Sequence, residues 1–249
     1  MVQILVIREV PYLLLILLCH PISIAIGAQA VAADWRSASR ESSLIAPRPE
    51  TTTEAVVQVY SARAFSWRGI FAVHTWISLK PEHAKNYTVY EVIGWHTLNG
   101  GSAIKIHQNE PDRYWFGARP KILSDLRGPE ATEAIKGIKA AAAAYPYVNT
   151  YTSWPGPNSN TFTAFIIRHV PELRTDLPPL AIGKDFLPHG KIFSRAPSGS
   201  GIQISILGVL GVLISVNEGI EFNLLSLSFG IDPGDFAIRL PVIGKIGLR

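Results

Sequence analysis

Two segments of the chain carry side chains that can act together in a covalent hydrolase. The first, residues 71–77, is strand-like, and His74 lies in it among β-branched and aromatic residues. The second begins 85 residues after His74, where Ser159 stands at the start of a predicted helix. A histidine base can take the proton of a serine hydroxyl as that hydroxyl attacks a carbonyl carbon. The pair therefore predicts acyl-transfer chemistry.

Each of these residues also has a structural interpretation. Asn158, Ser159 and Asn160 are good helix-capping residues, so Ser159 can serve the unpaired amides of the first helical turn instead of a substrate. His74 can be a half-buried histidine that is hydrogen-bonded to a neighbour. A catalytic interpretation needs His74 beside Ser159. Asn158 or Asn160 would then orient the imidazole or donate to the oxyanion, together with the amides of the first turn. Both interpretations stay open.

The order of these elements resembles the circularly permuted papain-like hydrolases. A strand with His74-Thr75, further strands, a helix and then Asn160-Thr161-Phe162 at a helix start carry the resemblance over roughly residues 55–170. NlpC-type cell-wall peptidases, PPPDE peptidases and lecithin:retinol acyltransferase relatives belong to that superfamily.

The resemblance implies roles for particular residues. His74 would be the base, and Ser159 would replace the catalytic cysteine. A third polar residue would come from the next strand, where Glu91 and His96 are the candidates. Because serine lacks a readily ionised thiol, the site is either a serine hydrolase or acyltransferase, or a fold that binds without turnover.

A second resemblance covers most of the chain. The segments 34–36, 72–77, 155–162 and 230–233 resemble a bacterial domain-of-unknown-function family, number 3750. That resemblance implies an uncharacterised envelope protein and does not decide between catalysis and binding.

Aromatic residues near these segments are candidates for contact with a small-molecule, peptide or glycan ligand, although core packing is their alternative role. They are Trp76, Trp95, Tyr151 and Trp154. Four histidines lie 9 to 13 residues apart, but they do not have the spacing of a zinc motif; they are His74, His83, His96 and His107. No metal or cofactor is predicted.

The apolar content, net charge and cysteine count of the chain limit which classes of function are expected. Of 249 residues 47% are hydrophobic and 17% charged, which predicts a folded core. The net charge is +4, with Lys and Arg scattered singly, so nucleic-acid binding is not expected. Cys19 is the single cysteine, which excludes disulfides and thiol chemistry from the body of the chain.

The N-terminal segment predicts that the protein is exported to the cell envelope. Residues 10–33 are almost entirely apolar and end in alanines that offer Ala-x-Ala cleavage sites. The segment is therefore a cleaved signal peptide or a retained membrane anchor. Both alternatives predict an exported protein, in the periplasm or on the outer face of the inner membrane.

The predicted fold class is α+β. We expect an antiparallel sheet of four to five strands with two helices packed on one face, in the permuted papain-like manner. The strands are expected near residues 56–60, 70–79, 87–95 and 103–107, with 113–116 as a further one, and the helices at 128–145 and 159–170.

The expected organisation has five parts. They are a leader (1–33), a polar linker (34–54), the α+β domain (55–171), a Pro-rich connector (172–200) and a β-rich tail (201–249). In the tail Ile202, Ile204 and Ile206 alternate with Gln203 and Ser205, which predicts a one-sided sheet. This apolar tail is also a candidate for contact with a membrane surface or a partner protein.

Overall fold

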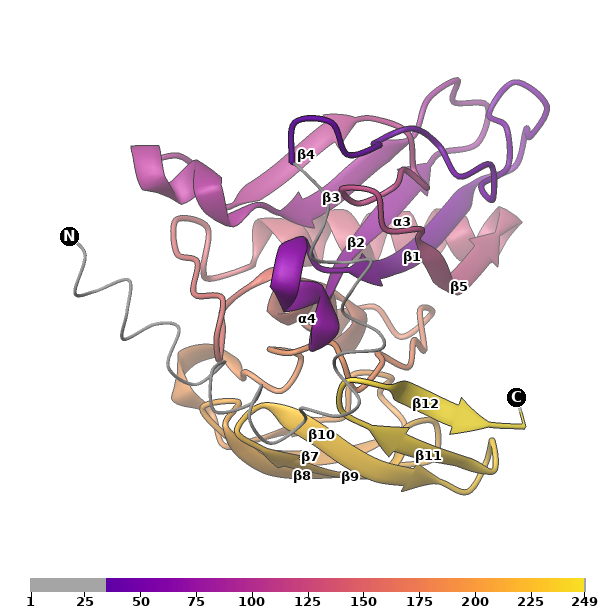
Figure 1. Cartoon of the computed structure of the whole chain (residues 1–249). Coiled ribbons are helices and arrows are strands. Elements are labelled where there is room, and N and C mark those ends of the chain that lie inside the picture. Colours follow the sequence, from indigo (N-terminus) through magenta and orange to yellow (C-terminus); the bar gives the residue numbers. More distant parts are fainter. Residues whose placement is uncertain (1–34, 249) are drawn as a thin grey trace.

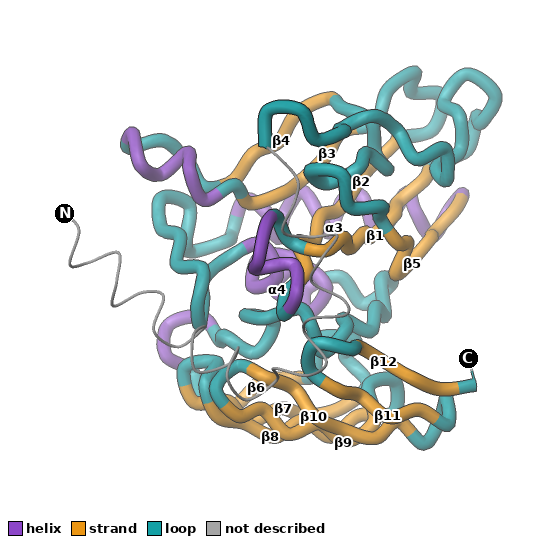
Figure 2. The backbone as a smooth tube through the Cα atoms, viewed as in Figure 1, coloured by secondary structure: helices purple, strands orange, loops and turns teal. Residues whose placement is uncertain are grey.

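The computed structural model describes residues 35–248, so the leader predicted over 1–33 lies outside the described part of the chain. The described chain forms two antiparallel sheets at opposite ends of the molecule (Figure 1). Figure 2 shows the strands as two separate groups, with helix α4 and long loops between them.

The first sheet has five strands in the order β4-β3-β2-β1-β5, and every pairing is antiparallel. The strands are β1 (Val56–Arg63), β2 (Val73–Lys80), β3 (Thr88–Val92), β4 (Ile104–Gln108) and β5 (Lys121–Arg127). Short 3-10 helices, η1 (Ser66–Ile70) and η2 (Gly94–Asn99), precede β2 and follow β3.

Helices α3 (Gly128–Ala143) and α4 (Ser159–His169) pack on one face of this sheet. Pro129 lies in the first turn of α3, where its missing N–H costs no hydrogen bond. Ile138 of α3 and Ile166 of α4 are fully buried against Val59 of β1 and its neighbours. The α+β fold class, with its two helices on one face, is confirmed.

The other face of the first sheet is covered by loops. Asp112 holds residues 42–46 there, because it accepts hydrogen bonds from the Ser42 hydroxyl at 2.7 Å and the Ile45 amide at 2.6 Å. Trp76 is fully buried beneath these loops. The segment predicted as a polar linker therefore packs on the sheet.

The fifth strand was predicted in the wrong place. Residues 113–116 make only isolated bridges, and the fifth strand is β5. As an edge strand with a register shift opposite Val59 and Tyr60, β5 does not alternate apolar and polar residues clearly. Trp95 lies in η2, although it was expected at the end of a strand.

The second sheet is a meander of seven consecutive strands. They are β6 (Phe193–Arg195), β7 (Gly201–Ile206), β8 (Leu210–Ser215), β9 (Gly219–Leu224), β10 (Leu227–Asp232), β11 (Ala237–Leu240) and β12 (Gly244–Gly247), with the short helix η3 (Pro188–Gly190) before them. The predicted β-rich tail is confirmed. No helix within residues 35–248 is long and apolar enough to cross a bilayer.

Candidate functional site

A pocket of about 420 Å³ lies at the amino end of β2, where α4 begins. His74 and Ser159 both line it, together with Trp95, Trp115 and Tyr151. The residues that sequence analysis paired for acyl-transfer chemistry therefore share one pocket. A larger and more polar hollow of about 730 Å³, beneath residues 42–50, includes none of the predicted site residues.

The start of α4 is held by a capping box centred on Asn158. Its side-chain oxygen accepts hydrogen bonds from the amides of Asn160 at 2.9 Å and Thr161 at 3.2 Å, and the Thr161 hydroxyl accepts from the Asn158 amide. The capping role considered for Ser159 thus belongs to Asn158. The Ser159 hydroxyl makes no hydrogen bond to any described residue, although the side chain is only 6% exposed.

The asparagine side chains do not serve His74 or an oxyanion. The Asn158 amide donates to the carbonyls of Ser153 and Ile182, and the Asn160 amide donates to those of Val73 and Ile182. Sequence analysis was wrong about this role, because both amides are committed to backbone carbonyls: Asn160 ties α4 to Val73 of β2, and both asparagines tie it to Ile182.

The predicted oxyanion hole is correspondingly smaller. The backbone amides of Asn160 and Thr161 are occupied by the cap. Within the first turn, the Ser159 amide is left for a ligand, since the described chain offers it no acceptor.

His74 is fixed by Glu91 and Trp115. Its Nε2 lies 3.2 Å from Glu91 Oε2, and its ring stacks on Trp115 with centroids 3.6 Å apart and planes 11° apart. Since a carboxylate only accepts, Nε2 carries the proton and Nδ1 carries the lone pair. Burial lowers the pKa of His74, and the Arg113 charge lowers it further, against the opposing effect of Glu91. The imidazole is therefore neutral at pH 7.

Glu91 is the centre of a buried polar cluster. It is 1% exposed and also accepts hydrogen bonds from His107 Nε2 at 2.8 Å and Arg113 Nη2 at 2.7 Å. Burial raises the pKa of the Glu91 carboxyl. Hydrogen bonds from His107 and His74 and the charge of Arg113 outweigh that effect and hold the pKa well below its usual range. Glu91 therefore faces His74 as a carboxylate.

The model of a protein family, described as a protein of unknown function (DUF3750), matches residues 54–186, more than half of the chain. The chain belongs to this family. The matched residues contain the five-stranded sheet, both helices and the pocket, and they end before the seven-stranded sheet. No curated protein and no solved structure matches the chain. The resemblance to papain-like hydrolases stays a prediction.

The other predicted site residues of this DUF3750 member are divided between the pocket and the core. Trp95 and Tyr151 line the pocket. His96 lies in η2 with its ring edge-on to Trp95, so Glu91 and not His96 contacts His74.

Two of the predicted ligand-contacting tryptophans are not at the pocket. Trp76 is buried, stacks on Tyr60 and donates to the Pro111 carbonyl. Trp154 donates to the Leu225 carbonyl and packs against an apolar cluster that includes Ile70 and Leu227, outside the pocket lining. Both were expected at a cleft because aromatic type alone does not distinguish a core ring from a lining ring.

Sequence reasoning missed His107, Arg113 and Trp115 as site residues. One signal was available for His107. Because β3 and β4 are antiparallel and His107 pairs with Val89, His107 and Glu91 are diagonal neighbours on one face. Within residues 35–248 no group of three or more His, Cys, Asp or Glu side chains is placed to hold a metal ion.

Proposed function

We propose that this DUF3750 domain is a serine hydrolase or acyltransferase acting on an amide or ester carbonyl. Ser159 is the nucleophile, His74 the general base and Glu91 the residue that orients the imidazole. One observation carries the proposal: Nε2 of His74 is committed to a buried carboxylate, which leaves the Nδ1 lone pair for the pocket that Ser159 lines.

The proposed steps need only these side chains. As Ser159 Oγ bonds to the carbonyl carbon, its proton passes to His74 Nδ1, and Glu91 stabilises the imidazolium. The Ser159 amide donates to the oxyanion. When the intermediate collapses, the bond to the leaving nitrogen or oxygen breaks, and His74 returns the proton to that atom. Water or an acceptor hydroxyl then takes the acyl group from Ser159 by the reverse sequence.

The chemistry requires a closer approach of Ser159 to His74 than the structure has. Ser159 and His74 line one pocket but are not hydrogen-bonded. Proton transfer needs Oγ within about 3 Å of Nδ1, and such contacts are often formed only when substrate binds. The aromatic rings of Trp95, Trp115 and Tyr151 favour a substrate with an apolar or sugar face, as in cell-wall-type glycopeptides.

A second candidate is a binding module without turnover. The missing Ser159–His74 hydrogen bond and the use of two first-turn amides by Asn158 favour it. In that case the same rings contact a peptide or glycan, and Ser159 and His74 supply polar contacts to it.

Labelling with a fluorophosphonate separates the two functions. The full chain is expected to react, Ser159→Ala to lose the label, and His74→Ala to react at least about a hundredfold more slowly. Ser153→Ala is the matched control, because Ser153 lines the same pocket and contributes its backbone carbonyl to Asn158. Absence of labelling in a folded chain, with a cell-wall fragment retained by both the parent and Ser159→Ala, would establish the binding module instead.

We also propose that the protein acts in the cell envelope. The support is the apolar run of residues 10–33 with its alanine-rich end. Fractionation of cells expressing the full chain tests this, and recovery of the chain with the cytosol would contradict it.

A further inference from the structure

The seven-stranded sheet is inverted: its apolar face points to solvent and its polar face points into the protein. One row of the outer face runs in register across six strands and consists only of isoleucine. Its members are Ile202, Ile214, Ile220, Ile231, Ile238 and Ile246. All of them except Ile220 are 50–54% exposed. A one-sided sheet on a soluble protein normally has the opposite arrangement.

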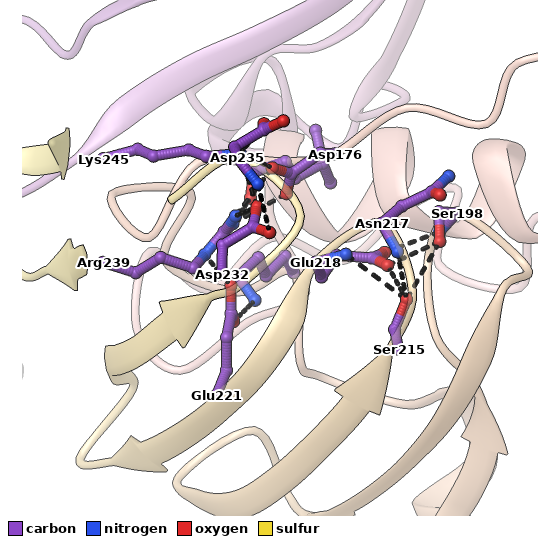
Figure 3. Close-up of polar contacts among 12 residues, drawn as sticks. Asp176, Ser198, Ser215, Asn217, Glu218, Glu221, Asp232, Asp235, Arg239 and Lys245 are labelled. Atoms are coloured by element: carbon purple, nitrogen blue, oxygen red, sulfur yellow. Dashed lines mark hydrogen bonds and ion pairs between the residues drawn. The ribbon is translucent and has the colours of Figure 1, made fainter. Parts of the chain in front are cut away.

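Buried charges fix this orientation. In Figure 3, Arg239 and Lys245 of the inner face converge with Asp232 on Asp176, which lies in the connector before the sheet. Arg239 Nη1 lies 2.6 Å from Asp176 Oδ2, and Lys245 Nζ lies 2.6 Å from Asp232 Oδ2. Glu221 of the same inner face pairs with Lys184 and Arg239. A slip of one residue would expose these pairs and bury the isoleucines, so the inversion is specified.

The outer face is large enough to be an interaction surface. Seven strands span about 30 Å, and three to six residues per strand give on the order of 500 Å² of nearly continuous apolar surface. Exposed patches of that size on soluble proteins usually mark an interaction site.

The chemistry of the outer face favours lipid over protein. In strands β6 to β12 the outward positions hold Ile, Leu, Val, Phe or Gly, apart from Arg195 on the edge strand β6, beside Ile202. Protein interfaces, homodimers included, carry roughly one hydrogen bond per 100–200 Å². This face offers no other side-chain donor or acceptor, and acyl chains require none.

The chain itself supplies a second argument. Residues 10–33, directly before the described part, are nearly all apolar and suited to a bilayer, either as a signal peptide or as an anchor. We infer that the outer face of the seven-stranded sheet lies on a phospholipid bilayer, with the isoleucine row against the acyl chains and Arg195 among the headgroups. This inference does not depend on the chemistry at Ser159.

Position-specific fluorescence tests the inference in the full chain. Cys19→Ser removes the native thiol, and pyrene is attached at Ile214→Cys or Ile238→Cys on the outer face, or at the exposed position Lys139→Cys of α3 as the control. Each protein is mixed with phosphatidylcholine–phosphatidylglycerol vesicles that contain spin-labelled acyl chains. Because the readout is local, insertion of residues 10–33 does not imitate it.

We expect quenching at both outer-face positions to exceed quenching at Lys139→Cys by at least about twofold. Equal quenching at all three positions would overturn the inference, as would no quenching at the outer face. Pyrene excimer emission from Ile214→Cys, with no quenching by the vesicles, would assign the face to a second copy of the chain instead.

Discussion

The inverted sheet predicts that two adjacent residues of β7 respond to substitution in the reverse of the usual order. Gln203 is 2% exposed, donates to Asp185 at 2.5 Å and accepts from Arg168 at 2.7 Å. Gln203→Leu removes both charge-assisted bonds and leaves two charged groups short of a partner, at a cost of about 3 kcal/mol. Ile204 is 49% exposed, so Ile204→Gln forfeits only about half of a buried isoleucine, or about 1 kcal/mol.

Urea unfolding of the two variants beside the parent chain, in one buffer, measures these free energies. Gln203→Leu should lower the free energy of unfolding by about 2 kcal/mol more than Ile204→Gln does. The slope of that free energy against urea concentration should be unchanged in both variants. Lys139→Ala, at an exposed position of α3, is the control and should stay within about 0.5 kcal/mol of the parent. If Ile204→Gln costs as much as Gln203→Leu, the outer face is buried in solution and the account of the sheet is wrong.

Four further predictions concern the pocket. In a Cys19→Ser background, Ser159→Cys should be alkylated at least about tenfold faster with His74 present than with His74→Ala, because a neighbouring imidazole favours the thiolate; equal rates would mean that the two side chains do not reach each other. The pKa of His74 lies below its usual value of about 6.5, so the rate of fluorophosphonate labelling should be at its maximum at pH 7 and fall at lower pH, where His74 is protonated. Glu91 raises the pKa of His74, so in Glu91→Gln the fall in labelling rate should occur at still lower pH than in the parent chain. A fall at the same or a higher pH would contradict the contact between Glu91 and His74. Asn158→Ala should lower the free energy of unfolding by about 2 kcal/mol, as measured in urea, because it removes the cap of α4; a loss under about 0.5 kcal/mol would show that the cap is unimportant.

The two helices on the first sheet were predictable because the residues that start and end a helix lie close together in the sequence. Pro129 and helical spacing predicted α3, the capping residues around Asn158 predicted the start of α4 at Ser159, and its apolar spacing placed the end of α4 one residue beyond His169. The edge strand β5 was missed because half-exposed edge strands show weak alternation.

The site was predictable only in part, for a similar reason. His74, Ser159 and Glu91 lie on regular elements whose order can be read from the sequence. Trp115 and Arg113 come from a loop that the sequence does not place beside β2. Asn158 and Asn160 were given the wrong role because their acceptors are carbonyls of distant segments.

The orientation of the second sheet could not be predicted from its alternation. A period of two is the same whichever face packs inward. The choice depends on charges outside the strands, since Asp176 and Lys184 pair with Arg239 and Glu221. These contacts join residues 37 to 63 positions apart, which pattern reasoning does not connect.

The most direct test of the proposed function is the rate of fluorophosphonate labelling at Ser159, mapped by mass spectrometry of the modified peptide. The account predicts a single adduct on Ser159 at pH 7, formed at least about a hundredfold faster in the parent chain than in His74→Ala. A folded chain that forms no adduct, or whose Ser159 labels at the same rate without His74, would contradict it.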